Sequence, residues 1–371
     1  GAAERGATVL TRTECIEALP MPPPAGDPGG LATWQATLRD ARGALQTVRA
    51  RALVNATGQW AARFLRDGAH RPGTRSLRLI KGSHIVVPRL FDHPYAYILQ
   101  SPDQRIVFAI PYENDFTLIG TTDVEDAETT GKVAISAAEV TYLCELINRY
   151  FTRGITPADV VWSYSGVRPL MDDESGDPSA VTRDYSLEIA ADGPPCLTVW
   201  GGKITTYRKL AEEAVDRIET ILPAPAAAAT VAQRSGWTAS EPLPGGNLPP
   251  ATAAGAPSAA PVAAVDGEAD LDRYRRWLQE RHPWLPVALA TRWAASYGTR
   301  TVRIIGAASR PDDLGAQIAP GLHEAELRYL RDHEWARSGD DALWRRSKLG
   351  LHLTAVQRNA VAAWFARGEA G

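Results

Sequence analysis

Paired glycines, a lysine and two threonines stand where an apolar strand gives way to a helix, in the segment VWGGKITTYRKL at residues 199–210. The N-terminus of a helix exposes unpaired backbone N–H groups and the positive end of the helix dipole, so it attracts anions and polarised oxygen atoms. Gly201 and Gly202 let another backbone or a ligand approach closely. The pattern indicates a binding turn for an anion or a carbonyl oxygen, into which Lys203 points.

A second turn of this kind lies in NATGQW, residues 55–60, where Thr57 and Gly58 separate a strand from a helix. Such a turn lets a backbone approach the pyrophosphate or the ring of a cofactor. An ordinary connection between a strand and a helix explains the same residues. The motif alone does not choose between the two interpretations.

His84, in KGSHIVVP, is a candidate proton acceptor because an imidazole titrates near neutral pH. A hydrogen-bonded core histidine is the alternative. Arg168, in YSGVRPLMDDES, stands in a run of small and apolar residues, so it needs a carboxylate or a ligand phosphate as its partner. Arg183 beside Asp184 indicates either a substrate contact or a structural ion pair. GTTDVED, residues 120–126, indicates a turn that caps the next element.

Alternating and helical patterns predict the elements that hold these residues. We expect a strand at 7–13, a hairpin that turns at Asp40–Gly43, and helices at 59–68, 136–151 and 205–222. Further strands are expected at 76–88, 96–100, 105–112, 116–123, 160–170, 185–190 and 196–202.

Three regions follow from the composition of the 371 residues. Residues 1–221 form a domain of mixed strands and helices, 222–268 form a linker rich in Ala, Pro and Gly, and 269–371 form a helical domain. In the helical domain, residues 273–284 are basic and aromatic. They favour either docking on an anionic membrane or a helix that packs through Tyr274, Trp277 and Leu278.

Composition argues against several classes of protein. A net charge of −3 gives no support for a general nucleic-acid binder. Cys15, Cys144 and Cys196 lie far apart without metal-ligand spacing, which fits a reducing compartment and predicts no metal site. No apolar run reaches 18 residues, so we expect no membrane-spanning helix.

The order of these motifs, from NATGQW through KGSHIVVP, YSGVRPLMDDES and VWGGKITTYRKL to DHEWARSGDDALWRR, resembles the FAD-dependent glycerol-3-phosphate dehydrogenases. These belong to the flavoproteins that resemble D-amino-acid oxidase. The resemblance implies an α/β and α+β fold: a glutathione-reductase-like FAD domain, a substrate domain on a mixed sheet, and a C-terminal all-helical domain.

The resemblance also implies a reaction. It is the oxidation of sn-glycerol 3-phosphate to dihydroxyacetone phosphate, with hydride passing from C2 to flavin N5 and electrons passing on to quinone. An oxidase of the same family would use oxygen. By resemblance, the catalytic residues are His84, Arg168 and Lys203, with His84 as the base; the substrate-binding residues are Arg168, Arg183 and Lys203; and FAD is held by Thr57, Gly58, Gly201, Gly202, Lys203, Ile204 and Thr205.

The GxGxxG fingerprint of such flavoproteins does not occur in this sequence. We therefore expect an incomplete FAD-binding domain, corresponding to the C-terminal two-thirds of the enzyme. An inactive fragment that serves as a binding or membrane-docking module is a further interpretation. The resemblance implies a cytoplasmic location, peripheral on the cytoplasmic face of the membrane, and leaves open whether the protein is a homodimer.

Overall fold

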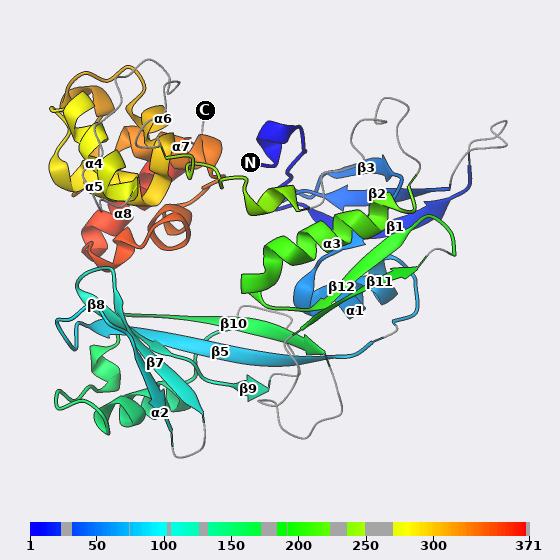
Figure 1. The fold of residues 1–371 in the computed structure, drawn as a ribbon, viewed down its shortest axis with the longest axis horizontal. Helices are drawn as coiled ribbons and strands as arrows, with labels where there is room; N and C mark the ends of the chain where they lie inside the picture. The colour runs from blue at the N-terminus through cyan, green and yellow to red at the C-terminus, as the bar shows by residue number, and fades with distance from the viewer. Residues whose placement is uncertain are drawn as a thin grey trace. The chain divides into compact units, whose positions relative to one another are not determined.

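A computed structural model describes residues 1–23, 32–73, 75–101, 105–125, 133–171, 184–190, 192–222, 236–248 and 270–368. The chain forms two compact units, which are described separately below (Figure 1). The sheet unit is Arg12–Ala239, and the helical unit is Gly1–Thr11 together with Ser240–Gly371. The predicted domain limits at 221 and 269 remain predictions, because residues 223–235 and 249–269 lie outside the described residues.

The sheet unit begins with three antiparallel strands in the order β1-β2-β3. They are β1 (Glu14–Met21), β2 (Thr33–Arg39) and β3 (Leu45–Ala50). The predicted hairpin is confirmed: Asp40 Oδ1 accepts the backbone N–H groups of Arg42 and Ala44, both at 2.8 Å, and Gly43 has φ of +85°. Glycine adopts this φ readily, whereas another residue would adopt it only with backbone strain.

The strand predicted at 7–13 is wrong. The first ladder starts at Glu14, and Val9 and Leu10 are exposed at 40% and 46%. β-branched composition alone does not make a strand when no neighbouring strand pairs with it.

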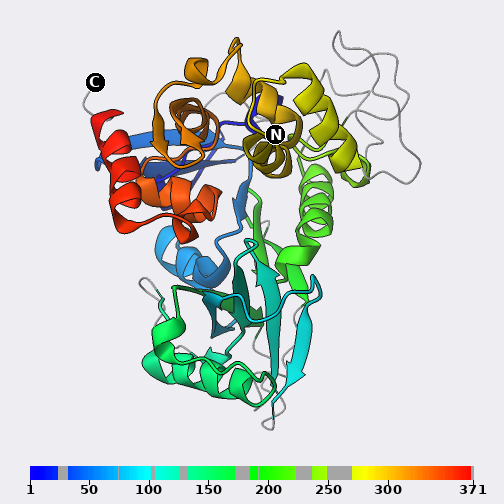
Figure 2. The same cartoon turned by 90° about the vertical axis from the view of Figure 1, so that its left-hand side faces the viewer.

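A larger antiparallel sheet follows the order β10-β5-β8-β7-β6, with β9 also paired to β5. Figures 1 and 2 show helix α2 (Ala137–Asn148) against one face of it. Leu143 and Ile147 of α2 pack on Ile85, Val107 and Ile119 of the strands. The strands are β5 (Leu77–Pro88), β6 (Tyr97–Gln100), β7 (Ile106–Tyr112), β8 (Phe116–Gly120), β9 (Val124–Glu125) and β10 (Trp162–Met171).

The third sheet has the order β11-β12-β4, in which β12 (Cys196–Gly201) runs parallel to β4 (Leu53–Asn55) and antiparallel to β11 (Tyr185–Ala190). Helix α3 (Tyr207–Glu219) packs on it through Ala214 and Leu210. Because β4 and β12 are parallel, their carboxyl ends meet at the same edge of the sheet. Short helical turns complete the unit: η2 (Gly58–Trp60), α1 (Ala61–Arg63), η3 (Phe64–Gly68), η4 (Pro157–Asp159), η5 (Ile204–Thr206) and η6 (Trp237–Ala239).

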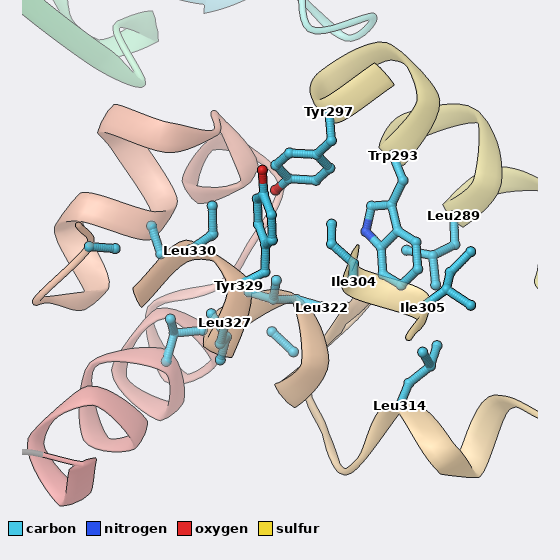
Figure 3. Close-up of a cluster of buried hydrophobic side chains, with 14 of the residues drawn as sticks. Leu289, Trp293, Tyr297, Ile304, Ile305, Leu314, Leu322, Leu327, Tyr329 and Leu330 are labelled. Carbon is cyan, nitrogen blue, oxygen red and sulfur yellow. The ribbon is translucent and has the colours of Figure 1, made fainter. Parts of the chain in front are cut away.

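The helical unit has its own apolar core, in which Trp293, Tyr297 and Tyr329 lie among leucines and isoleucines (Figure 3). Glu326 is fully buried in it, yet satisfied: Arg292 holds both of its carboxylate oxygens at 2.6 Å. The elements are η1 (Ala3–Arg5), α4 (Asp270–Arg281), α5 (Val287–Tyr297), η7 (Gly298–Arg300), α6 (Thr301–Ile305), η8 (Pro311–Leu314), β13 (Gln317–Ala319), β14 (Leu322–His323), α7 (Glu324–His333), η9 (Asp341–Arg346), η10 (Leu349–Leu351) and α8 (Ala355–Gly368).

Residues 240–248, predicted as part of the linker, belong to this unit. Leu248 contacts the core residues, and the backbone N–H of Thr299 donates to the Gly245 carbonyl at 3.0 Å. Gly245 fits because a Cβ there would lie 2.3 Å from the carbonyl oxygen of Tyr297. The Ala, Pro and Gly content of this stretch led to the linker prediction and did not reveal its packing.

The basic, aromatic stretch at residues 273–284 is mostly covered by its own unit. Tyr274 and Leu278 are buried, Trp277 and Trp284 pack against the core, and Arg273 pairs with Asp270. The structure therefore agrees with the packed-helix interpretation of this stretch.

Glu139 joins α2 to the large sheet. Its buried carboxylate accepts hydrogen bonds from Ser83 Oγ at 2.9 Å, Thr122 Oγ1 at 2.7 Å and the Ser136 backbone N–H at 2.8 Å, and it pairs with Lys81 at 2.9 Å. Burial alone would raise the pKa of Glu139, but the Ser136 amide, Lys81 and the hydroxyl donors outweigh it and lower the pKa to about 2.

We predict that Glu139→Gln lowers the free energy of unfolding by about 3 kcal/mol, because Lys81 loses the partner of a buried ion pair. Since the folded pKa is lowered, the carboxylate stabilises the protein fully above its ordinary pKa of 4.5 and loses this effect as the pH falls toward 2. Urea unfolding between pH 7 and pH 3 measures both effects. Glu145→Gln, at an exposed position of the same helix, should change stability by less than about 0.5 kcal/mol. Equal effects of the two substitutions would contradict the prediction.

Candidate functional site

Two strands of the large sheet place the candidate residues on one face. In the β5–β10 pairing, His84 lies opposite Tyr164, and Arg168 lies opposite Ile80. His84 also lies opposite Gly120 of β8. Directly paired residues share a face of an antiparallel sheet, and so do residues two apart along one strand. His84 and Arg168 therefore lie on the face opposite α2.

The His84 ring stacks on Tyr164, with ring centroids 4.8 Å apart and planes 6° apart. On its other side is Gly120, where a Cβ would lie 2.2 Å from His84 Cδ2. Only glycine therefore fits beside this ring.

Nδ1 of His84 is buried, and among the described residues the ring has no hydrogen-bond partner. This differs from a hydrogen-bonded core histidine. The pKa of His84 is lowered from its ordinary value of 6.5, first by burial of the ring and then by the positive charge of Arg168. The imidazole is thus neutral at neutral pH and has a lone pair that can accept a proton.

Arg168 lies over the other end of this face. Its Nη1 pairs with Asp123 Oδ1, and its Nη2 donates to Thr121 Oγ1 at 3.0 Å. The guanidinium covers Gly82, where a Cβ would meet Nη2 at 2.6 Å. Gly166, directly opposite Gly82, has open space where its Cβ would be. The space above Gly166 is therefore open, whereas the space above Gly82 is filled by Arg168 and Thr121.

The remaining polar residues of KGSHIVVP lie on the other face. Lys81 and Ser83 both contact Glu139, so the period of two along β5 separates them from His84. The motif is therefore half structural: Lys81 and Ser83 anchor α2, and His84 is its one polar side chain on the face with Arg168.

The Gly-Gly-Lys turn follows β12 as predicted. Gly201 and Gly202 have φ of +66° and +100°. A Cβ on Gly201 would lie 3.1 Å from the carbonyl oxygen of Asp184, and 3.6 Å from that of Pro169, the residue after Arg168. Lys203 is exposed, and none of the described residues forms an ion pair with it. Neither Lys203 nor Thr206 caps the following helical turns with its side chain.

The second predicted turn lies nearby. Thr57 Oγ1 donates to Asn55 Oδ1 at 2.7 Å, and Asn55 Nδ2 donates to the Ala61 carbonyl at 3.0 Å, so the buried asparagine shapes the turn. Gly58 has φ of +61° and open space around its Cβ position. Element η2, which begins at Gly58, contacts both β10 and β12.

The structure thus brings the two turns and the end of β10 together, with His84 farther along the same sheet face. Arg183 lies outside the described residues, so its roles in substrate binding or in a pair with Asp184 stay predictions. Sequence reasoning missed Tyr164, Thr121 and Asp123. Tyr164 and Arg168 are separated by an even number of residues along one strand, so they share a face, and this spacing was a signal that the sequence offered. The contact of Asp123 with Arg168 depends on the pairing of strands that are distant in the sequence.

Among the described helices, none has the length and apolar character of a membrane span. The described residues also contain no cluster of His, Cys, Asp or Glu that could hold a metal ion.

We predict that Arg168→Met raises the pKa of His84 toward 6.5, because the positive charge is lost while the burial stays. NMR titration of the histidine ring nitrogens in the ligand-free protein measures it. Below 6.5, folding must keep His84 neutral while the unfolded chain binds a proton, so this residue lowers the stability of the native protein as the pH falls. Arg78→Met is the control. It removes a positive charge from the same strand, at a residue that pairs with Glu125. The prediction is wrong if neither variant changes the pKa of His84.

Comparison with known proteins identifies the family of this chain. The model of the FAD dependent oxidoreductase family matches residues 1–208, and that of the C-terminal domain of alpha-glycerophosphate oxidase matches residues 236–366. A glycerol-3-phosphate dehydrogenase of Pseudomonas aeruginosa is 44% identical over 96% of this chain and 63% of its own length. The aerobic glycerol-3-phosphate dehydrogenase of Escherichia coli is 42% identical over 97% of this chain and 66% of its own length. The D-erythritol 1-phosphate dehydrogenase of Brucella abortus is 39% identical, over 98% of this chain and 66% of its own length.

The chain spans just under two thirds of the length of these curated relatives. A crystal structure of the glycerol-3-phosphate dehydrogenase from Bacillus halodurans with FAD has a TM-score of 0.69 at 23% identity, and the match covers 99% of this chain and 66% of that one. The predicted fold class, a mixed α/β flavoprotein fold with a C-terminal helical domain, is thereby confirmed. Because the family model covers more than half of its residues, the chain belongs to the FAD-dependent oxidoreductase family.

Proposed function

We propose that this site oxidises the C2 hydroxyl of a polyol phosphate, with sn-glycerol 3-phosphate as the substrate and dihydroxyacetone phosphate as the product. The observation that carries the proposal is that a neutral histidine without a hydrogen-bond partner among the described residues lies on the same face as an arginine, beside the open space at Gly166. The names of the relatives support the choice of substrate.

The dimensions of the face suit a three-carbon phosphate. The Arg168 guanidinium lies over Gly82, which is two residues from His84 on β5, and two residues of a strand span about 7 Å. A glycerol phosphate can bridge this distance with its phosphate on Arg168 and its C2 hydroxyl on His84. Lys203 and Arg183 are the further cations that we propose for the phosphate.

The residues present also fit a flavin. Ile204 is 85% exposed beside Lys203 and Thr205, at a turn whose backbone N–H groups have no side-chain cap. Such a turn suits a flat apolar ring with a carbonyl edge, because the helix N-terminus favours negative charge there. Thr57 and Gly58, with Gly201 and Gly202, would form the other contacts.

When bound, FAD supplies the acceptor for the hydride that leaves C2. The chain's own residues handle the proton and the orientation: Arg168 holds the phosphate, and His84 takes the proton of the C2 hydroxyl as the carbonyl forms. The two electrons leave with the hydride, and the phosphate stays on the product. His84 is suited to this because its lowered pKa keeps it unprotonated.

We propose quinone as the electron acceptor, supported by the name of the aerobic relative from Escherichia coli, and peripheral association with the cytoplasmic face of a membrane, because quinones dissolve in lipid. An oxidase that reduces oxygen is the alternative. Peroxide formed per product molecule separates the two: a stoichiometric yield without quinone would contradict the dehydrogenase proposal.

The function is tested with the protein expressed from its complete open reading frame, purified with FAD and freed of unbound ligand. We predict that sn-glycerol 3-phosphate bleaches the flavin absorbance without oxygen, and that His84→Gln slows this step by about 10²- to 10⁴-fold with flavin content unchanged. Glycerol, which lacks the phosphate, is the control, and D-erythritol 1-phosphate tests the substrate of the Brucella abortus relative. Bleaching by glycerol as fast as by its phosphate would contradict the proposal.

Lys203→Ala is predicted to lower flavin retention and to raise the KM for glycerol 3-phosphate, because Lys203 lies at the turn that we assign to both ligands. Lys209→Ala, on the exposed side of α3 where Lys209 lies near Glu212, is the matched control. Absorbance after gel filtration and steady-state kinetics are the measurements. If Lys203→Ala behaves like Lys209→Ala, the Gly-Gly-Lys turn is not the flavin site.

A further inference from the structure

We propose that Asp123 lowers the affinity of this site for phosphate groups by competing with them for Arg168. In the ligand-free protein its carboxylate occupies Arg168, and a phosphate must compete with it for the guanidinium. The proposal rests on the proposed function, because it takes Arg168 as the receptor of the substrate phosphate.

The contacts hold Arg168 in one place. Nη1 pairs with Asp123, and Nη2 donates to Thr121 Oγ1 at 3.0 Å, while the guanidinium covers Gly82 from above. A bidentate contact with a phosphate uses two N–H groups of the fork. Asp123 already pairs with Nη1, one of the two terminal nitrogens, so a phosphate must displace Asp123 to bind both of them.

The charge balance points the same way. The Arg168 and Asp123 side chains are only 31% and 25% exposed, so their surroundings are less polarisable than water. The negative charges of Asp123 and of an incoming phosphate repel each other more strongly there than in water. Lys81 does not relieve this repulsion, because it lies on the opposite face and pairs with Glu139. Arg78 pairs with Glu125 at 3.0 Å. A phosphate that approaches Arg168 therefore meets a site whose local charge Asp123 has cancelled.

Ligands that share this competition differ in their other contacts. Inorganic phosphate gains only the contact with Arg168 and its neighbouring cations, so Asp123 weakens its binding directly. A polyol phosphate adds a hydrogen bond at His84, which inorganic phosphate cannot make. Both anions must displace Asp123 from Arg168, so the carboxylate weakens both by the same factor, and the difference between their affinities comes from the contact with His84.

The test is calorimetric titration of the ligand-free protein with inorganic phosphate at low ionic strength. Asp123→Asn should bind phosphate about tenfold more tightly than the unaltered protein, which corresponds to about 1.4 kcal/mol. Glu125→Gln is the matched control: it removes the same charge two residues away, from the pair with Arg78, and should change the affinity by less than threefold. A weaker or unchanged affinity in Asp123→Asn overturns the proposal and makes Asp123 a support for Arg168 instead.

Arg168→Met separates failure of this inference from failure of the proposed function. If Arg168→Met binds phosphate as tightly as the unaltered protein, Arg168 is not the phosphate receptor and the substrate site itself is wrong. If Arg168→Met loses phosphate binding but Asp123→Asn gains none, only the competition is wrong.

Two further measurements cover a variant that fails to fold. Asp123→Ser removes the charge with a smaller side chain and should tighten phosphate binding as Asp123→Asn does. In the unaltered protein, the carboxyl carbon resonance of Asp123 should shift as phosphate is added, because Asp123 gives up its partner. A resonance that stays still while phosphate binds overturns the proposal.

Discussion

The alternation of side chains along β5 is the constraint on which the site depends. Lys81 and Ser83 turn toward Glu139 and anchor α2, while His84 and Gly82 face the other way. A slip of one residue in the pairing with β10 would exchange the two sets and turn Lys81 onto the face that His84 now occupies. The buried carboxylate of Glu139 opposes such a slip, because it is satisfied only in this register. The structural half of the motif thereby fixes the chemical half.

A second constraint brings the two predicted turns together. The parallel pairing of β4 with β12 places the residues after Asn55 and after Gly201 at one edge of their sheet. β10 connects this edge to the large sheet, because the residue after Arg168 packs against Gly201. A shift at the Gly-Gly-Lys turn is therefore felt by the strand that carries Arg168, which couples the proposed flavin contacts to the proposed phosphate contact.

Local signals in the sequence were sufficient for local structure. The hairpin at Asp40–Gly43 and the helix that starts after Ser136 depend on residues within a few positions of each other, and both were predicted correctly. The strand at 7–13 failed because a strand exists only through a partner, which composition does not supply. The same limit applies to the site. His84 and Arg168 stood out by residue type, whereas Tyr164 and Asp123 matter only through neighbours that are distant in the sequence.

The charges of the site are balanced before any ligand arrives: His84 is neutral, and Arg168 is paired. Substrate and product of the proposed reaction carry the same phosphate, so any affinity that comes from the phosphate alone holds both equally and does not speed the chemical step. An unopposed arginine would retain the product as firmly as the substrate. A carboxylate that takes back the guanidinium lowers this shared affinity, whereas the contact between His84 and the C2 hydroxyl exists only while that hydroxyl does. By this reasoning, the pair of Arg168 and Asp123 lowers the affinity for substrate and product alike, and the contact at C2 alone distinguishes the two.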